Sequence, residues 1–356
     1  MLTTIQDAVK LFLPYKRKTN SSSGWISFNA PCCHHNGENA DTRGRGGVIF
    51  DAGGSVNYHC FNCNYKATYR TGYHLNYKFR KWLNWLGASE AEVKKLVIDA
   101  LRVKELAPPE RFKEEVEHEE VVFPPRPLPT GAKEFTQLAT FYELGNNGNY
   151  ENVPSDFYNA VSYVQNRRVD MVKYDFYWTE DPEHNMHKRV IIPCYWKGEL
   201  IGSTARTLED GIKPKYYADY ASNFVFNMDN QVSDNKVVLV MEGPFDAMAV
   251  DGVAVLSNEC SEIQADIIDS MGKEVIVVPD FDVKTVKGKQ VWAGEKLVDQ
   301  ALEYGWAVSF PVWREEVKDV AEANEKYGKL FTMKAILDGK QTSRLKIELM
   351  KRKINA

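Results

Sequence analysis

The sequence predicts an α/β fold preceded by a small β-rich, metal-binding ribbon. In the first 75 residues, two pairs of cysteine and histidine residues lie on either side of a predicted hairpin. From residue 236 onward, apolar segments such as VVLVM and EVIVV alternate with segments of helical periodicity. Buried strands that alternate with helices are typical of a parallel sheet. A chain of 356 residues is long enough to hold both parts.

The residue pairs of the ribbon have the spacing of zinc ligands. They are Cys32-x2-His35 and Cys60-x2-Cys63. The stretch between them predicts two strands, 47–51 and 55–59, joined at Gly53-Gly54. Because a hairpin returns the chain to its start, three thiolates and one imidazole can converge on one tetrahedral Zn²⁺. The metal would then supply folding free energy that so small a ribbon lacks.

The identity of the first two zinc ligands stays open at this point. Cys33 and His34 lie beside the first pair, so the ligands can be Cys32/His35, Cys33/His35 or Cys32/Cys33. We favour Cys32 with His35, because two intervening residues let both side chains face one metal without strain.

The ribbon also interleaves basic and aromatic residues. Arg43, Arg45, Lys66 and Arg70 lie among several tyrosines and phenylalanines, a pattern that suits single-stranded DNA, whose bases stack and whose phosphates pair with cations. For Tyr58 and Phe61 we expect instead a place in the small core of the ribbon.

Five segments divide the chain. They are a ribbon with a helical extension (1–104), a linker (105–132), a mixed segment with many cations (133–235), the α/β part (236–330) and a basic C-terminal helix (331–356). In the helical extension, Ser89 and Glu92 have the S-x-x-E spacing of a capping box, which predicts a helix start. The linker is inferred from its six prolines, because proline lacks a backbone donor and favours extended chain.

Charge and composition narrow the function classes. The net charge of −4 argues against an indiscriminate nucleic-acid coat protein, although the first 80 and last 30 residues are basic. No run of 18 apolar residues and no signal-peptide layout occur, so we expect a cytoplasmic protein without a membrane segment. The absence of a G-x-x-x-x-G-K-[ST] motif argues against an ATP-driven motor on this chain.

Carboxylates follow the apolar strands of the α/β part. An E-G-P-x-D motif runs from Glu242 to Asp246, and Asp280 and Asp282 follow the strand EVIVV. Because the carboxyl ends of parallel strands meet at one edge, these side chains should surround one crevice and bind Mg²⁺ or Mn²⁺. Asp319, after WAVSFPV, is a further metal ligand or, equally, the N-cap of the last helix of this part.

A run of cations precedes the carboxylates. Residues 188–217 hold Arg189, Arg206, Lys213 and Lys215. Cations that face a carboxylate cluster are the expected complement of a polyanionic triphosphate or template. Arg206 and Lys215 are the strongest candidates for such contacts.

These motifs together resemble bacteriophage DNA primases. The segments CCHHNGE and YHCFNC are similar to the zinc ribbon of bacterial and bacteriophage primases, except that Cys33 stands where that family has proline. The E-G-P-x-D and D-x-D elements look like the TOPRIM fold, and residues 188–217 resemble the basic element that precedes it. Size and the missing motor make the chain most similar to the stand-alone primases of T-even-like bacteriophages. The K-D-x-N-D element of that family departs here to K-D-V-A-E.

The resemblance implies a function and a set of roles. The chain would synthesise short RNA primers from ribonucleoside triphosphates on single-stranded DNA during phage replication, by metal-dependent nucleotidyl transfer. Glu242 would act in acid–base chemistry or hold the first metal, Asp280 and Asp282 would hold metal, and Asp246 would support them. A replicative helicase on a separate chain and the cytoplasm of an infected bacterium follow from the same resemblance. The alternative is a zinc-containing TOPRIM protein for single-strand binding, repair or nuclease action.

Overall fold

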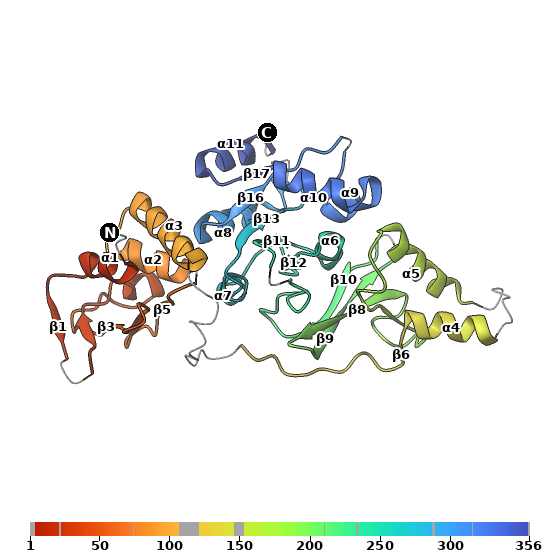
Figure 1. Cartoon of the computed structure of the whole chain (residues 1–356). Coiled ribbons are helices and arrows are strands. Elements are labelled where there is room, and N and C mark those ends of the chain that lie inside the picture. Colours follow the sequence, from red (N-terminus) through yellow and green to blue (C-terminus); the bar gives the residue numbers. More distant parts are fainter. Residues whose placement is uncertain are drawn as a thin grey trace. The chain divides into compact units, whose positions relative to one another are not determined.

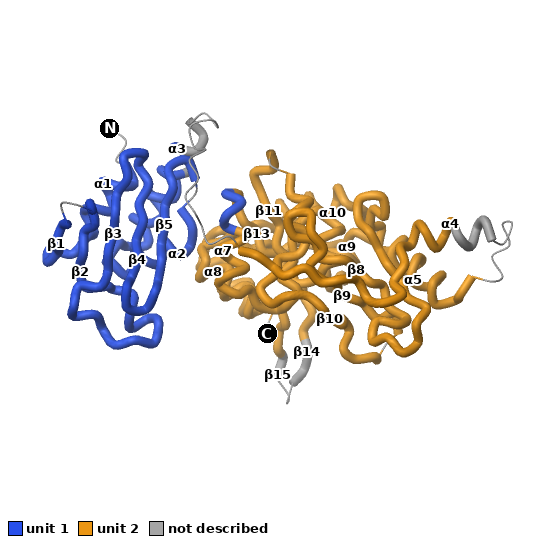
Figure 2. Tube along the Cα trace, turned by 90° about the horizontal axis from the view of Figure 1, so that it is seen from below, with its two compact units in different colours: residues 1–119, 269–272 blue, residues 120–268, 273–356 orange. Residues whose placement is uncertain are grey.

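The computed structural model describes residues 4–20, 23–73, 75–106, 121–145, 153–209, 211–232, 234–286, 289–314 and 316–354. The chain forms two compact units (Figure 2). Unit 1 comprises residues 1–119 and 269–272, and unit 2 comprises residues 120–268 and 273–356. Within the described residues, no helix combines the length and the apolar character required to span a membrane.

Unit 1 is built on one antiparallel sheet of five strands in sequence order. The strands are β1 (Arg17–Thr19), β2 (Ile26–Phe28), β3 (Gly46–Phe50), β4 (Val56–Cys60) and β5 (Lys66–Tyr69). Strands β3 and β4 confirm the predicted hairpin to within one residue at each end. Alternate residues of β4 are buried, namely Val56, Tyr58 and Cys60, so one face of the sheet forms the core and the other stays open. The core position expected of Tyr58 is thus confirmed, whereas Phe61 is 65% exposed, so the same expectation for Phe61 is wrong.

Helices cover the buried face of this sheet. They are α1 (Ile5–Phe12), α2 (Tyr77–Trp85) and α3 (Glu90–Leu106), and a 3-10 turn, η1, spans Cys33–Asn36. Trp82 of α2 stacks on Tyr58 at a centroid distance of 4.5 Å. The predicted capping box is present, because Ser89 N donates to Glu92 Oε2 at 2.8 Å and Glu92 N donates to Ser89 Oγ at 3.3 Å.

Unit 2 begins with a second antiparallel sheet. Its order is β10-β9-β8-β7-β6, formed by β6 (Ala132–Glu134), β7 (Tyr177–Thr179), β8 (Arg189–Trp196), β9 (Glu199–Thr207) and β10 (Tyr216–Tyr220). Helices α4 (Phe135–Gly145) and α5 (Ser155–Asn166) belong to this part. The turn at Lys197 and Gly198 between β8 and β9 is fixed by Asp229, which accepts from both backbone amides at 2.9 and 2.8 Å.

The remainder of unit 2 is the predicted parallel α/β part (Figure 1). Its sheet order is β12-β11-β13-β16-β17, with all but β17 parallel. The strands are β11 (Val237–Met241), β12 (Val253–Ala254), β13 (Glu274–Val277), β16 (Ala307–Ser309) and β17 (Lys340–Gln341), beside a hairpin of β14 (Val283–Val286) and β15 (Lys289–Trp292). Its strand cores, such as Val238, Val240 and Ile276, are buried, as a sheet covered on both faces requires.

Helices lie on both faces of the parallel sheet. Those beside β11 and β16 on one face are α6 (Pro244–Val250), α9 (Val320–Tyr327) and α10 (Lys329–Asp338), and they pack on one another. On the other side lie α7 (Glu262–Ser270) and α8 (Glu295–Tyr304), and α11 (Arg344–Ile354) ends the described chain. The segment boundary expected at residue 330 therefore falls inside α10, whose packing on α9 and α6 makes it part of the α/β layer.

The second half of the predicted linker packs on unit 2. Phe123 is buried, with its ring edge-to-face against Trp196 at 5.1 Å, and Trp196 Nε1 donates to Val121 O at 3.0 Å. Arg126 pairs with Asp219 at 2.8 Å. Residues 121–131 are thus an extended strap on this unit, while residues 107–120 lie outside the described residues.

Candidate functional site

Four cysteines of unit 1 form a compact thiol cluster. Cys32, Cys33, Cys60 and Cys63 have sulfur atoms that all lie within 4.8 Å of one another. The Sγ–Sγ distances are 3.4 Å for Cys32–Cys63 and 3.5 Å for Cys33–Cys60. Zn–S bonds of about 2.3 Å in a tetrahedron put sulfurs about 3.8 Å apart, so this set fits a zinc ion. Burial raises the pKa of the Cys32 thiol, and a bound cation is what would stabilise its thiolate.

The fourth thiol of this cluster is Cys33, in place of the expected His35. The 3-10 turn starts at Cys33, and His35 N donates back to Cys32 O at 3.2 Å. This turn directs both adjacent sulfurs inward and sends the His35 ring outward, where it stacks on Trp85 at 4.6 Å with an interplanar angle of 6°. The structure therefore corrects the first ligand pair to Cys32 and Cys33.

Amide side chains surround the thiol cluster. Asn62 Nδ2 lies 3.4 Å from Cys33 Sγ, and Asn36 Nδ2 lies 3.7 Å from Cys63 Sγ. Donors of this kind partly neutralise thiolates and fix their orientation.

Five carboxylates of unit 2 gather where the parallel strands end, and we call them the carboxylate edge. They are Glu242, Asp246, Asp280, Asp282 and Asp319. Glu242 follows β11 directly and accepts from Asp280 N, beyond β13, at 3.4 Å. Asp246, buried on α6, accepts from Ala321 N at 2.8 Å. These bonds link β11, β13, α6 and α9 around one site, as the order of the strands predicted.

Asp319 is the N-cap of α9. Its Oδ1 accepts from Glu322 N at 2.7 Å. The same oxygen lies 3.9 Å from Arg167 Nη1. The N-cap role that the sequence allowed for Asp319 is thus present. The negative charge of Asp319 also raises the pKa of Asp246 and of Asp280.

The carboxylate edge carries strong electrostatic repulsion. Burial, then Asp319 and Asp280, raise the pKa of Asp246 well above its usual value. Burial, then Glu242 and Asp319, raise the pKa of Asp280 to about 8. Repulsion of this size is relieved by a proton or by a cation.

The donor type of these carboxylates suits a hydrated metal. Among the described residues, the four cysteines are the group of three or more potential ligands that already lies close enough together to hold a metal ion; the carboxylates do not form such a group. Mg²⁺ keeps several waters and takes only one or two carboxylates beside substrate oxygens. The oxygen-only donor set therefore fits Mg²⁺ or Mn²⁺ better than zinc.

A cluster of cations and aromatic rings lies within electrostatic reach of the carboxylate edge. We call it the cation–aromatic cluster; its members are Tyr163, Arg167, Arg206 and Tyr216. The Arg206 guanidinium lies 5.8 Å from the Tyr163 ring centroid and 5.1 Å from that of Tyr216. Arg206 Nε and the Tyr163 hydroxyl are buried without a hydrogen-bond partner among the described residues. Buried polar groups are normally paired, so this cluster is suited to an anionic ligand.

Lys215 belongs to the same electrostatic environment. Partial burial of its ammonium group, then the charge of Arg206, lower the pKa of Lys215, while Asp319 and Asp280 oppose that shift. The residue as a whole is exposed. Lys215 therefore lies within electrostatic reach of both Arg206 and the carboxylate edge, and its nucleotide contact stays a prediction.

Arg189 and Lys213, the other two expected nucleotide contacts, have surroundings that differ from those of Arg206 and Lys215. Arg189 is buried, and its Nη1 donates to the backbone oxygens of Ala205, Pro214 and Lys215 at 3.1–3.4 Å. It braces the segment that carries Lys215, because a buried guanidinium must satisfy its donors. Lys213 is exposed, and its role stays a prediction. The sequence prediction did not include Arg167 among the nucleotide contacts. Its signal in the sequence is the A-x-x-Y-x-x-x-R pattern that begins at Ala160.

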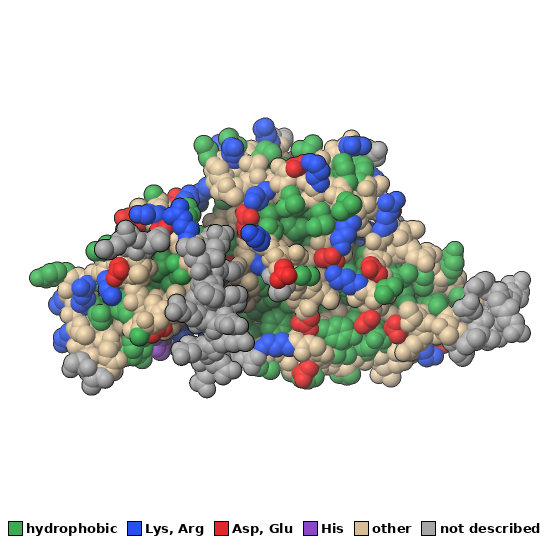
Figure 3. Space-filling model, in the orientation of Figure 1, with side chains coloured by type: hydrophobic (Ala, Val, Ile, Leu, Met, Phe, Trp, Pro, Cys, Tyr) green, Lys and Arg blue, Asp and Glu red, His purple; other side chains and the backbone are tan. Residues whose placement is uncertain are grey.

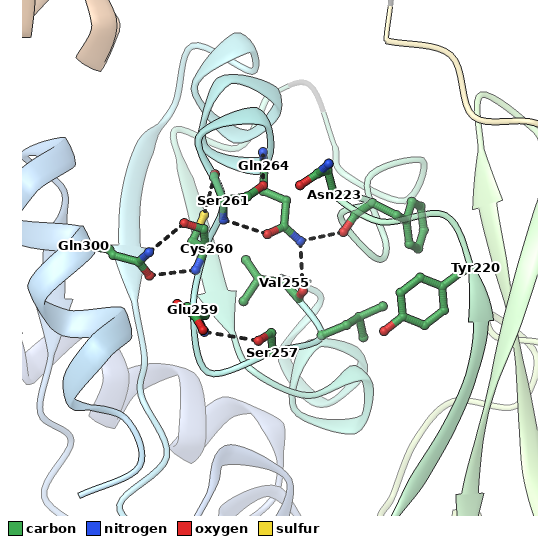
Figure 4. A pocket seen from close by; sticks show the side chains of 11 residues that line it. Tyr220, Asn223, Val255, Ser257, Glu259, Cys260, Ser261, Gln264 and Gln300 are labelled. Atoms are coloured by element: carbon green, nitrogen blue, oxygen red, sulfur yellow. Dashed lines mark hydrogen bonds between the residues drawn. The ribbon is translucent and has the colours of Figure 1, made fainter. Parts of the chain in front are cut away.

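A cavity of about 320 Å³ lies beyond the carboxyl end of β12 (Figure 4). The loop that lines it is braced by glutamines. Gln300 exchanges hydrogen bonds with the backbone of Cys260 at 2.7 and 2.8 Å, and Gln264 donates to Phe224 O and Val255 O. Sequence reasoning missed this cavity, because it depends on contacts between distant segments.

On the face of the molecule shown in Figure 3, acidic and basic side chains lie interspersed over the described part of unit 2. This mixture agrees with a net charge of only −4. The described part of this face therefore offers no general basic surface, and anion binding is expected at the cation–aromatic cluster instead.

Comparison with solved structures finds a likeness to a primase. No family model matches the sequence, and no curated protein matches it. The chain is similar in structure to the Aquifex aeolicus primase, solved as its zinc-binding and RNA polymerase domains. That similarity has 17% sequence identity, covers 96% of this chain and 85% of that chain, and has a TM-score of 0.41. At that score, the function has to be inferred from the residues and geometry of the chain itself.

Proposed function

We propose that this protein is a DNA primase, which makes short RNA primers from ribonucleoside triphosphates on a single-stranded DNA template. The observation that carries the proposal is the carboxylate edge, whose mutual repulsion a bound cation would relieve, together with the half-buried Arg206, whose Nε has no hydrogen-bond partner among the described residues. Metal-bound carboxylates facing a phosphate site are the arrangement that nucleotidyl transfer needs.

The residues divide the chemistry between them. Arg206 and Lys215 bind the phosphates of the incoming nucleotide, and Arg167 holds Asp319 in place. Asp280 and Asp282 would hold Mg²⁺ or Mn²⁺, and a metal bound there would supply positive charge that neutralises the transferring phosphate. The 3′-hydroxyl of the primer forms a bond to the α-phosphorus, the bond to pyrophosphate breaks, and Glu242 is placed to accept the hydroxyl proton. Asp246 would support these carboxylates by accepting a hydrogen bond from Ala321 N, which ties α6 to the start of α9.

The zinc-binding ribbon supports a role in template recognition. A closed four-thiolate site is structural and offers no open position for catalysis. It would rigidify unit 1, which carries basic and aromatic residues suited to a single strand.

The setting of this activity belongs to the same proposal. The sequence resemblance to T-even-like bacteriophage primases supports a role in phage DNA replication in the cytoplasm of an infected bacterium. A replicative helicase on a separate chain would then be the partner, and its addition should raise primer yield on a covered template.

The test is primer synthesis on mixed-sequence circular single-stranded DNA with labelled ribonucleotides and Mg²⁺. We expect short RNA products that Glu242→Gln abolishes. The matched control is Glu274→Gln, at the far end of β13, where an exposed pair with Lys340 is lost and the activity should remain. Cleavage of the template without RNA products would instead support the alternative, a TOPRIM nuclease. Binding without either reaction would support a single-strand-binding protein.

A further inference from the structure

Tyr163 contacts both arginines of the cation–aromatic cluster. Its ring centroid lies 5.1 Å from the guanidinium carbon of Arg167 and 5.8 Å from that of Arg206. Arg206 also lies over the ring of Tyr216, at 5.1 Å, and Arg167 also lies over the ring of Phe245, at 6.0 Å. Among the described rings that these arginines contact, Tyr163 is therefore the one that both share.

Local structure explains how these groups meet. Tyr163 and Arg167 are one helical turn apart at the end of α5, so their side chains lie on the same side of the helix. Arg206 on β9 and Tyr216 on β10 are direct cross-strand partners, so they point to the same face of the sheet. The helix and the sheet thus each bring one arginine to the Tyr163 ring.

The ring of Tyr163 also links the arginines to the carboxylate edge. It lies edge-to-face against Phe245, at a centroid distance of 5.3 Å and an interplanar angle of 80°. Phe245 is buried on α6 and directly precedes Asp246 in the E-G-P-x-D motif. The Tyr163 ring therefore fixes both arginines relative to the helix that carries Asp246.

The hydroxyl group of Tyr163 takes no part in these ring contacts. Its oxygen is buried and has no hydrogen-bond partner among the described residues. A buried, unpaired hydroxyl lowers the stability of a protein, so the useful part of this side chain is its ring. Arg206 is only half-buried, so a ligand can reach its side chain from the solvent.

Aromatic rings are well suited to hold an arginine that binds phosphate. A guanidinium group over a ring is attracted by the charge distribution of the ring, while its N–H donors lie in its own plane. That plane stays available for paired hydrogen bonds to phosphate oxygens. An arginine that is already oriented loses little conformational entropy when the phosphate binds.

We propose that Tyr163 is a positioning residue, whose ring holds Arg206 and Arg167 in the arrangement that binds a triphosphate. Arg206 then meets the phosphates, and Arg167 keeps its place beside Asp319. This inference rests on the proposed function, from which it takes the phosphate contact of Arg206. It adds a residue that acts through its neighbours and touches neither substrate nor metal.

The test measures the binding of inorganic tripolyphosphate, in the presence of Mg²⁺, to the full-length protein by isothermal titration calorimetry. Tyr163→Leu removes the ring, and we expect the affinity to fall at least about tenfold. The KM for ribonucleotides in primer synthesis should rise by a similar factor. Tyr163→Phe keeps the ring and should retain the affinity of the wild type. The matched control is Tyr158→Leu, an exposed tyrosine of the same helix, which should bind as the wild type does.

A double-mutant cycle with Arg206→Ala separates positioning from general packing. Because Tyr163 acts through Arg206, Tyr163→Leu should weaken binding much less in the Arg206→Ala protein than in the wild type. An equal loss in both backgrounds would overturn the proposal, and so would a loss in Tyr163→Phe as large as that in Tyr163→Leu. Melting temperatures identify a variant that has not folded, and Tyr163→Met then takes the place of Tyr163→Leu.

Primer synthesis by the wild type distinguishes this inference from the proposed function. Unchanged tripolyphosphate binding in Tyr163→Leu, beside a wild type that makes primers, would overturn the role of Tyr163 and leave the proposed function intact. Ring-dependent binding by a wild type that makes no RNA would support the positioning role and contradict the proposed function.

Discussion

Asp280 shows how single residues set the energetics of this site. Its carboxyl group lies beside Glu242 and Asp319, and burial with these charges raises its pKa to about 8. In the folded protein Asp280 keeps its proton at pH values at which the unfolded chain has already released it. The free energy of unfolding therefore falls as the pH rises through this range. The relevant window runs from the ordinary carboxyl pKa near 4 to about 8.

We therefore expect Asp280→Asn to become more stable relative to the wild type as the pH rises from about 4 to about 8 in the presence of EDTA. The asparagine removes the titrating charge while keeping the shape. Denaturant unfolding at a series of pH values measures the difference between the two proteins. Mg²⁺ at the upper pH should reduce that difference, because it binds the ionised wild type, and a difference independent of pH would contradict the assignment.

At the scale of elements, the 3-10 turn at Cys33–Asn36 decides the chemistry of the ribbon. It brings adjacent sulfurs, Cys32 and Cys33, to one side and turns His35 toward Trp85. The 3-10 turn therefore positions Cys32 and Cys33, and the β3–β4 hairpin brings Cys60 and Cys63 to them.

This geometry predicts that Cys33→Ser loses zinc, whereas His35→Ala retains it. Serine removes one of four thiolates, and the remaining three bind zinc far more weakly. Atomic absorption of the purified proteins gives the zinc content. Full zinc in Cys33→Ser, with loss in His35→Ala, would restore the original ligand set.

Elements whose signals are local were predictable from the sequence. The hairpin was predicted by its alternation and by Gly53-Gly54, and the carboxylate edge by the position of acids after apolar strands. The inward direction of Cys33 and the exposure of Phe61 depend on the backbone path around the thiols, which spacing alone leaves open. The packing of Phe123 on Trp196 joins residues 73 positions apart. Proline content reports only local backbone preference, and it therefore suggested that the whole segment 105–132 is a linker.

On the scale of the whole molecule, each unit has its own source of stability. Unit 1 holds a core cluster that includes Cys32, Cys33 and Cys60 among Val48, Tyr58 and Trp82. Unit 2 holds a separate parallel sheet with strand residues such as Val240 and Ile276 fully buried. Bound zinc should therefore stabilise unit 1 and leave the stability of unit 2 unchanged.

We expect a strong zinc chelator to lower the melting temperature of unit 1 while unit 2 remains folded. Thermal scanning should then give two transitions, with only one of them sensitive to the chelator. Limited proteolysis at an intermediate temperature, followed by mass spectrometry, identifies the unit that opens. A single transition that shifts as a whole would contradict this independence.

Asp319 has a consequence for how far this sequence can vary. One oxygen of its side chain caps α9 through Glu322 N, and the same carboxylate adds negative charge beside Asp246 and Asp280. Asparagine, serine or threonine can replace the cap but not the charge, and glutamate keeps the charge but caps poorly. Each of the two demands tolerates several residues, but aspartate alone meets both. This position should consequently accept almost no substitution, even though neither role by itself would forbid one.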